Sequence, residues 1–151
     1  LVTIGSSAFY RNENLQEITL PANVATIGKW AFYGCSKLRN IAIPEGITTL
    51  DSYLLSNCSS LESVTIPSTV TIIGERALEN CTSLTTIELP NSLKEIGDYA
   101  LSNCKGLTNV TIPEGVTYLG EDVFLACSSL QSVTLPTSLT TINNFMFHYC
   151  I

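Results

Sequence analysis

The residues with the clearest chemical potential are six cysteines spaced at one constant interval. They stand at positions 35, 58, 81, 104, 127 and 150, each 23 residues after the last. An even number of cysteines often forms a disulfide framework. If the interval stacks them in successive turns of a coil, however, their Cβ atoms lie about 4.8 Å apart, beyond the roughly 3.5–4.5 Å that a disulfide needs. We therefore expect free, buried thiols, with disulfides between neighbours as the alternative.

Metal binding and catalysis find little support among the other reactive residues. No Cys-x-x-Cys pair occurs and His148 is the single histidine, so the ligand spacing of a zinc site is missing. His148 falls in a column of residues 23 apart whose variability indicates an exposed surface: Tyr10, Tyr33, Ser56, Glu79, Ser102 and Leu125. The 16 Ser and 18 Thr come with neither a Gly-x-Ser-x-Gly turn nor a glycine-rich phosphate loop. We expect no enzyme activity, no metal and no cofactor.

Composition and charge argue against two classes of partner. The chain has 13 acidic and 7 basic residues, a net charge of −6 and a pI of about 4.6, so it lacks the basic surface that binds nucleic acid. No apolar run approaches the roughly 18–20 residues of a membrane span, and Leu1–Ile4 lacks the charged start of a signal peptide. We expect no nucleic-acid binding and no membrane insertion within this chain, and we expect any export signal to lie outside it.

Every proline and every cysteine belongs to one 23-residue register. The prolines stand at 21, 44, 67, 90, 113 and 136, again 23 apart. A fixed period of this length is typical of stacked repeat proteins, in which each unit buries its apolar side chains against its neighbours. The 151 residues hold about six and a half such units. We expect residues 1–151 to be a single repeat array and a piece of a longer protein.

Apolar columns within the unit predict two short extended segments. Leu, then Ile or Val, then Leu or Ile recur from positions 15, 18 and 20 onward in steps of 23. This alternation indicates a strand, which the following proline ends. Because one strand per unit cannot form hairpins, equivalent strands must pair in parallel between repeats. A second pair, such as Val24 and Ile27, fits either a helical turn or a shorter strand, and β-branched residues in its equivalents favour extended chain.

A glycine column predicts a sharp corner followed by a helical turn. The column reads Gly5, Gly28, Asp51, Gly74, Gly97, Gly120 and Asn143. After Gly, the residues that best tolerate left-handed backbone are Asp and Asn, so we expect positive φ at this column. Beyond it, pairs such as Ala31-Phe32 lead to a cysteine three residues later. That spacing suits one short helical turn packed inward.

The repeat unit also matches a known motif. The residues Ile41-Ala42-Ile43-Pro44, Ile47, Leu50, Ala31-Phe32 and Cys35 resemble the BspA-type leucine-rich repeat, and the resemblance covers the whole chain. It implies a leucine-rich repeat solenoid, a right-handed curved coil with a parallel β-sheet on its concave face and short strands or helical turns on the other sides. It further implies a surface-exposed or secreted protein of a host-associated microbe, in a family with members that adhere to host matrix proteins or cells. It supplies no catalytic residue.

Two surfaces are candidates for recognition. Residues beside the buried strand positions point outward on the predicted concave face, and their small polar groups suit many shared hydrogen bonds. A plain soluble coat is the alternative. The candidate partner-binding residues of this face are Glu17, Thr19, Arg39, Glu62, Thr65, Glu88, Thr111 and Thr134. Past the glycine corner, Trp30, Tyr53, Tyr99 and Phe145 form an aromatic column, interrupted by Arg76 and Asp122, which either anchors an interface or covers the edge of the core.

These features together predict a non-enzymatic interaction module. We expect it to lie on the cell surface or outside the cell and to bind a protein or glycan ligand, with host extracellular matrix among the candidates. The alternative is a structural spacer or an array that associates with itself end to end. That alternative is favoured by the lack of a polar capping segment at either end of the repeats.

Overall fold

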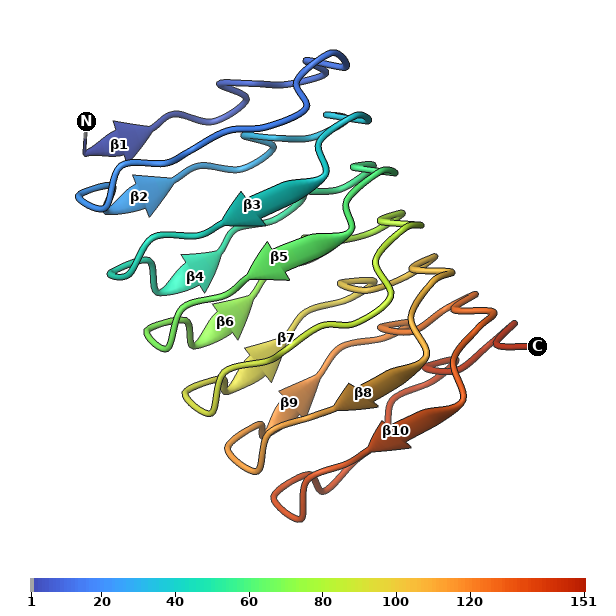
Figure 1. Ribbon diagram of the computed structural model, residues 1–151. Helices are drawn as coiled ribbons and strands as arrows, with labels where there is room; N and C mark the ends of the chain where they lie inside the picture. Colours follow the sequence, from blue (N-terminus) through green and yellow to red (C-terminus); the bar gives the residue numbers. More distant parts are fainter. Residues whose placement is uncertain (1) are drawn as a thin grey trace.

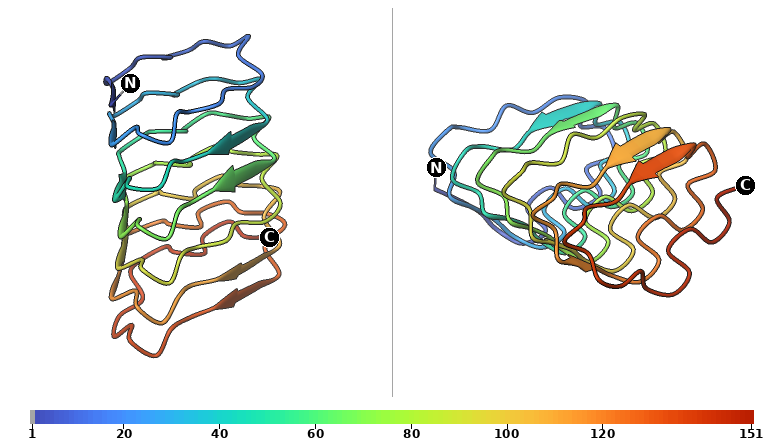
Figure 2. Two further views of the ribbon diagram at one scale, coloured as in Figure 1. Left: turned by 60° about the vertical axis from the view of Figure 1, so that its left-hand side comes forward. Right: turned by 90° about the horizontal axis from the view of Figure 1, so that it is seen from below.

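The computed structural model describes residues 2–151, which form a parallel β-solenoid of about six turns (Figure 1). The turns are stacked on one another, with the termini toward opposite ends of the stack (Figure 2). We number the coils from the leucine column, so that coil 1 begins at Leu15, coil 2 at Leu38 and later coils in steps of 23, after a leading half-coil of residues 2–14. Residues 2–151 include no helix long and apolar enough to cross a membrane.

The strands of successive coils form two files along the stack. The first file holds β3 (Asn40–Ala42), β5 (Ser63–Thr65), β8 (Asn109–Thr111) and β10 (Ser132–Thr134). The second file holds β1 (Thr3–Ile4), β2 (Thr26–Ile27), β4 (Thr49–Leu50), β6 (Ile72–Ile73), β7 (Glu95–Ile96) and β9 (Tyr118–Leu119). All pairs are parallel and offset by 23 residues, as Ile72↔Glu95 illustrates. The predicted parallel pairing is confirmed, and the second apolar pair is extended chain.

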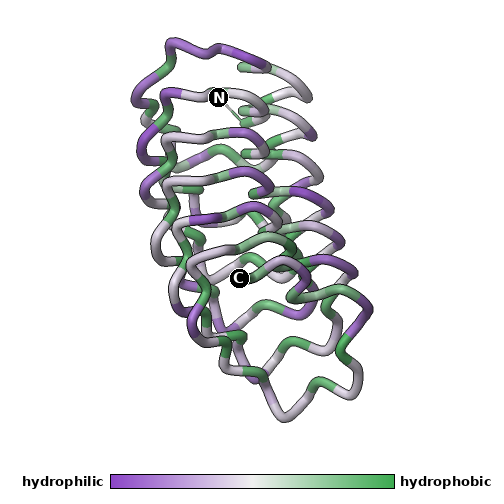
Figure 3. The backbone as a smooth tube through the Cα atoms, turned by 90° about the vertical axis from the view of Figure 1, so that its right-hand side faces the viewer, coloured by the Kyte–Doolittle hydropathy of each residue, from purple (hydrophilic) through white to green (hydrophobic). Residues whose placement is uncertain are grey.

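The core consists of columns in which like side chains pack directly over one another. Leu38, Leu61, Leu84 and Leu107 are all 0% exposed. The hydrophobic positions recur at the same places in coil after coil (Figure 3). Leu15 and Leu130 are only partly buried, because each lacks a leucine of the same column on one side. No coil therefore has a core of its own, and each depends on its neighbours for burial.

Each proline ends the first-file segment of its coil and begins a tight turn. The amide three residues later donates to the proline carbonyl, as Val24 N does to Pro21 O at 3.1 Å and Leu93 N to Pro90 O at 3.0 Å. Because proline has no amide hydrogen, it contributes no donor to the ladder at this point. The turn carries the chain from the first file to the second.

The turn segment, residues 28–35 in coil 1 and their equivalents, is a run of tight turns. Its amides alternate between two kinds of acceptor. Ala31 N donates to Gly28 O of its own coil at 3.2 Å, whereas Phe32 N donates to Leu54 O of the next coil at 3.0 Å. The predicted helical turn is wrong, because half of these amides bond between coils and a helix would bond them all within one coil.

Left-handed backbone occurs at other positions than the glycine column, so that prediction is also wrong. No residue of the column has positive φ, whereas Trp30 (55°) and Tyr53 (59°), two residues further on, do. A second such position precedes the cysteine, as at Asn57 (63°). Bulky residues rarely adopt this conformation. Here the amide of Tyr53 donates to Glu75 O of the next coil at 2.9 Å, and such bonds between coils hold the backbone in place.

Glycine is required in its column because neighbouring coils approach closely there. A Cβ added to Gly97 would lie 2.8 Å from the amide nitrogen of Glu75, and one added to Gly74 would lie 2.9 Å from the carbonyl oxygen of Leu50. This approach lets the glycine amide reach the preceding coil, as in Gly97 N–Ile73 O at 2.8 Å. The column therefore provides space between coils, and the conformational freedom of glycine is not used.

Strands of the second file pair with the preceding coil only where the column holds glycine. Gly28, Gly74, Gly97 and Gly120 follow the pairs β1–β2, β4–β6, β6–β7 and β7–β9. Asp51 follows β4, which does not pair with β2, and the residues just before Asn143 form no strand. A Cβ at these two positions keeps the coil away from its predecessor. At Asn143 the side-chain amide donates to Leu119 O, where other coils use the backbone amide.

The substitution Gly97→Ala is expected to lower the free energy of unfolding by about 1–3 kcal/mol, because the new Cβ overpacks against the backbone of coil 3. Gly5→Ala is the matched control, since nothing lies within 4 Å of its added Cβ. Its effect should stay within about 0.5 kcal/mol. Urea denaturation followed by circular dichroism measures both. Equal stability of the two variants would show that glycine does not set the spacing of the coils.

Candidate binding surfaces

The triplet face is the surface formed by residues 16–19 and their equivalents in every coil, and it is the face that the sequence predicts to be concave. In β3, β5 and β8 the middle residue is buried and its two neighbours are exposed. All eight candidate residues are exposed: Glu17, Thr19, Arg39, Glu62, Thr65, Glu88, Thr111 and Thr134. The strand register aligns them along the stack, with Thr134 directly beside Thr111.

The sheet on this face is interrupted at coil 4, although the sequence predicts a strand in every repeat. β3 pairs with β5, and β8 pairs with β10, but residues 86–88 pair with neither β5 nor β8. This part of coil 4 is a plain loop between β5 and β8 (Figure 1). At coil 1, a single bridge joins Glu17 to Asn40. The backbone of the triplet face is therefore open to hydrogen bonding at coil 4.

Two shallow hollows lie on the triplet face. One has a volume of about 260 Å³ and is lined by coils 1 to 3, with Glu17, Asn40 and Thr65 among its residues. The other, of about 360 Å³, lies beside the interruption and includes Glu88 and Thr111. Each hollow holds one carboxylate among amide, hydroxyl and aliphatic groups. Four of the eight candidate residues thus line these two hollows.

Hydrogen bonds between coils fix some polar side chains of this face. Ser63 Oγ donates to Asn40 Oδ1 at 2.7 Å, and Ser132 Oγ donates to Asn109 Oδ1 at 2.6 Å. Asn109 Nδ2 donates onward to Thr108 Oγ1 at 3.2 Å. Side chains held in this way lose little conformational entropy when a partner binds.

The aromatic column forms a stack on the outer edge of the turn segments. The rings of Trp30 and Tyr53 are stacked with centroids 5.6 Å apart. The Arg76 guanidinium lies 5.8 Å from the Tyr53 centroid and 4.4 Å from that of Tyr99, so the cation is held between two aromatic rings. A hydrogen bond to Asp122 raises the pKa of Tyr99. Trp30 is 38% exposed, so the stack both covers the turn segments and offers an aromatic surface to solvent.

Phe145, the last member of the predicted column, lies outside this stack. It is 64% exposed and its ring centroid lies 5.4 Å from that of His148. The His148 ring in turn lies 3.9 Å from the ring of Tyr149. His148 is exposed, as its variable column predicts. The structure therefore brings three of the four predicted aromatic residues together, with Arg76 as the bridge.

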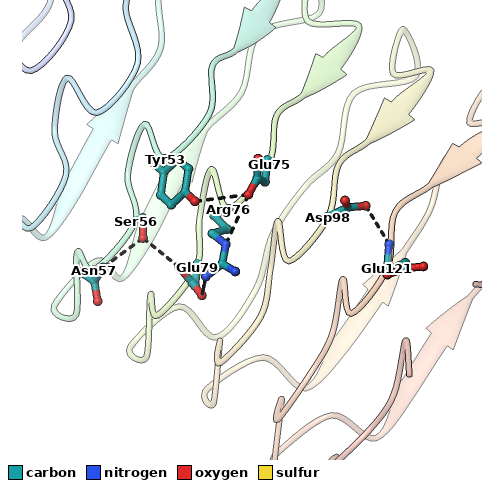
Figure 4. A network of polar contacts seen from close by, with 8 residues as sticks. All are labelled: Tyr53, Ser56, Asn57, Glu75, Arg76, Glu79, Asp98 and Glu121. Atoms are coloured by element: carbon teal, nitrogen blue, oxygen red, sulfur yellow. Dashed lines mark hydrogen bonds and ion pairs between the residues drawn. The ribbon is translucent and has the colours of Figure 1, made fainter. Parts of the chain in front are cut away.

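Carboxylates hold Arg76 in the stack (Figure 4). Arg76 Nη1 donates to Glu79 Oε1 at 3.0 Å, and its Nε lies 3.5 Å from Glu75 Oε1. The Tyr53 hydroxyl donates to the same Glu75 oxygen at 3.2 Å. Burial and the negative charge of Glu75 raise the pKa of Tyr53, so its phenol stays a neutral donor. Residues of coils 2 and 3 thus share one polar network at the edge of the solenoid.

Two serines in the column that contains His148 are buried in the middle of the array, so the expectation of a surface fails at these two positions. Ser56 is 0% and Ser102 1% exposed, because central coils cover small side chains from both sides. Ser56 Oγ donates to Glu79 Oε2 at 3.3 Å (Figure 4). Within the described residues Ser102 Oγ has no hydrogen-bond partner.

The six thiols are free, as the spacing predicts, and they bond between coils. Cys58 Sγ donates to Phe32 O at 3.2 Å and Cys81 Sγ to Leu55 O at 3.3 Å. Burial raises the pKa of all six, that of Cys127 to about 12. A thiol that keeps its proton is a poor nucleophile and metal ligand. Over residues 2–151 no group of three or more His, Cys, Asp or Glu side chains is placed to hold a metal ion.

A family model confirms what the repeat unit suggests. The model of the BspA type leucine rich repeat region matches residues 2–71 and 56–151, with six copies of the repeat. The chain belongs to the BspA-type leucine-rich repeat family. Leucine-rich repeat proteins are generally protein-interaction modules and are typically non-enzymatic. A search of curated proteins finds no match.

Solved structures of bacterial leucine-rich repeat proteins have the same fold. A leucine-rich repeat protein of T. pallidum is 36% identical with a TM-score of 0.87, over 91% of this chain and 64% of that chain. One from Bacteroides ovatus is 26% identical with a TM-score of 0.76, over 99% of this chain and 45% of the other. The pneumococcal vaccine antigen PcpA, at 22% identity and a TM-score of 0.68 over 91% and 43%, shares the fold alone. The BspA-type chain thus spans 64% or less of each of these proteins.

The central thiols of this BspA-type array are expected to be unreactive while the protein is folded. Their raised pKa values keep the thiolate fraction small at pH 8, and burial blocks the reagent. Ellman's reagent should label all six thiols in guanidinium chloride. In the native protein it should label at most the partly exposed Cys150. Rapid labelling of Cys81 or Cys104 in the folded protein, located by mass spectrometry, would contradict this prediction.

Substitution by alanine should lower the stability of the protein at one serine of the column that contains His148 and not at the other. Ser56→Ala removes the hydrogen bond to Glu79 and is expected to lower stability by about 1 kcal/mol. Ser102→Ala removes a buried hydroxyl without a partner and should leave stability unchanged or raise it. Thermal unfolding of both variants beside the wild type measures the difference. Equal destabilisation of the two variants would contradict the prediction that a hydrogen-bond partner makes Ser56 contribute more to stability than Ser102.

Proposed function

We propose that the chain is a non-enzymatic binding module whose triplet face docks a protein partner. The observation that carries this proposal is the exposure of all eight candidate residues along one face, over a core made only of stacking columns. Contacts spread over several coils give affinity without a deep pocket. The general role of leucine-rich repeat proteins as interaction modules supports the same conclusion.

Charge on the triplet face favours a partner with basic groups. Three of the eight residues, Glu17, Glu62 and Glu88, are acidic, and Arg39 is the one cation among them. Glu17 and Glu88 line the two hollows, where a partner's Lys or Arg side chain finds a carboxylate beside neutral acceptors. The net charge of −6 adds long-range attraction for a basic surface.

The proposed location is the surface or the exterior of a microbial cell, with proteins of the host extracellular matrix as partners. The repeat family supports this location. Free cysteines are unusual in oxidising surroundings, but a buried thiol with a raised pKa is protected from oxidation. The thiol column is therefore compatible with an extracellular protein.

Replacing Thr65 and Thr111 together by Trp is expected to weaken binding to a matrix protein by about tenfold or more, because the large rings fill the two hollows. The probes are immobilised fibronectin, laminin, collagen and mucin, read by biolayer interferometry. The matched control carries Thr117→Trp and Thr140→Trp, which lie outside the triplet face and are also exposed. An equal loss in both variants, or no binding of the wild type to any probe, would count against the proposal.

A further inference from the structure

The junction between coils 1 and 2 is open along the second file of strands. Thr48 N and Asp51 N donate to no backbone acceptor in residues 2–151. One junction further, the equivalent bonds are made, with Thr71 N–Thr48 O at 2.8 Å and Gly74 N–Leu50 O at 2.7 Å. The difference follows from Asp51, the one residue with a Cβ in the glycine column between coils 1 and 5. A departure from the repeat thus leaves backbone donors and acceptors facing solvent.

A hollow of about 520 Å³ occupies this open junction. Its size lies in the range of pockets that hold small molecules. Five hydroxyls and one carboxylate form its polar lining: Thr3, Ser6, Thr26, Thr48, Thr49 and Asp51. The rest of the lining is aliphatic or glycine, and no Lys, Arg or His belongs to it.

The polar groups of the hollow keep capacity for a ligand. Thr26 Oγ1 donates to Thr3 Oγ1 at 2.9 Å, which leaves the Thr3 hydroxyl proton available. Asp51 Oδ1 accepts from Ser52 N at 2.8 Å, and the second carboxylate oxygen remains for a donor from outside. Together with the unbonded amides of Thr48 and Asp51, the hollow offers both donors and acceptors at close quarters.

An aromatic surface stands at the end of the same junction. Trp30 and Tyr53 follow Gly28 and Asp51 by two residues, and their rings stack across the two coils. Bonding between the coils resumes at Trp30 N–Ser52 O, at 3.3 Å. Trp30 is 38% exposed and stands two residues along the chain from Gly28, the last residue of coil 1 in the lining, so its flat apolar ring is available to a ligand that extends beyond the hollow.

We infer that this junction is a binding site for a neutral carbohydrate. Sugar hydroxyls both donate and accept hydrogen bonds, which matches the mixture of threonine hydroxyls, backbone amides and the Asp51 carboxylate. The apolar face of a sugar ring suits the indole of Trp30. An anionic ligand would meet the carboxylate with no cation to offset it. A peptide strand is disfavoured because the stretch without bonds between coils 1 and 2 covers only residues 25–27 and 48–51, below a usual strand length of about five residues.

A glycan array tests this inference, which does not depend on the triplet face. It carries neutral gluco-, manno- and galacto-configured oligosaccharides, sialylated and sulfated ones, and an array of extended peptides beside them. The decisive variant is Asp51→Gly, which restores glycine to the column and closes the junction. Its matched control is Asn143→Gly, the same change at the other non-glycine position. Trp30→Ala tests the aromatic surface, and circular dichroism melts report whether each variant is folded.

The wild type is expected to bind neutral oligosaccharides in preference to anionic ones and to peptides. Asp51→Gly should lower that affinity by about tenfold or more while melting at or above the wild-type temperature, and Trp30→Ala should lower it severalfold. Asn143→Gly should bind within about twofold of the wild type. The inference is overturned by three outcomes: no binding to neutral glycans, binding only to anionic glycans or peptides, or undiminished binding by folded Asp51→Gly.

Discussion

The backbone hydrogen bond between equivalent positions of neighbouring coils is the constraint on which the rest of this protein depends. In the second file the amides reach back to the preceding coil, as Gly97 N does to Ile73 O at 2.8 Å, and in the turn segment they reach forward, as Phe32 N does to Leu54 O at 3.0 Å. These bonds hold the coils about 4.8 Å apart. At that spacing the leucines stack on one another, each thiol reaches a carbonyl of the preceding coil, and the aromatic rings and Arg76 come into contact.

Features that repeat identically could be predicted from the sequence. The parallel strands, their ends at the prolines and the free thiols each follow from residue types that recur at one interval, since each coil places equivalent residues over those of the coil before it. Leu61 is buried for the same reason as Leu84, and Cys58 stays free for the same reason as Cys81. Residues that flank a buried strand position, such as Thr65 and Thr111, are exposed because strand alternation turns them outward.

Features that depend on backbone spacing or on the number of neighbours could not be read from residue types. A glycine column fits either positive φ or close approach, and only the distances between coils separate the two. Trp30 and Tyr53 have left-handed backbone although their residue types argue against it, because bonds to the next coil decide the conformation. Ser102 is buried by its central place, while Tyr10 of the same column is 49% exposed near the end of the array.

Departures from the repeat are where recognition sites can arise. An ideal array presents the same surface at every step, so nothing on it marks one place for a partner. Asp51 opens a junction through a single Cβ, and residues 86–88 leave the first file unpaired beside Glu88. Both departures were visible in the sequence, Asp51 in a column of glycine and Glu88 in a column otherwise made of Thr and Ala. Because the apolar core continues through both places, the array can vary its surface at one coil without losing the stacking that holds its neighbours.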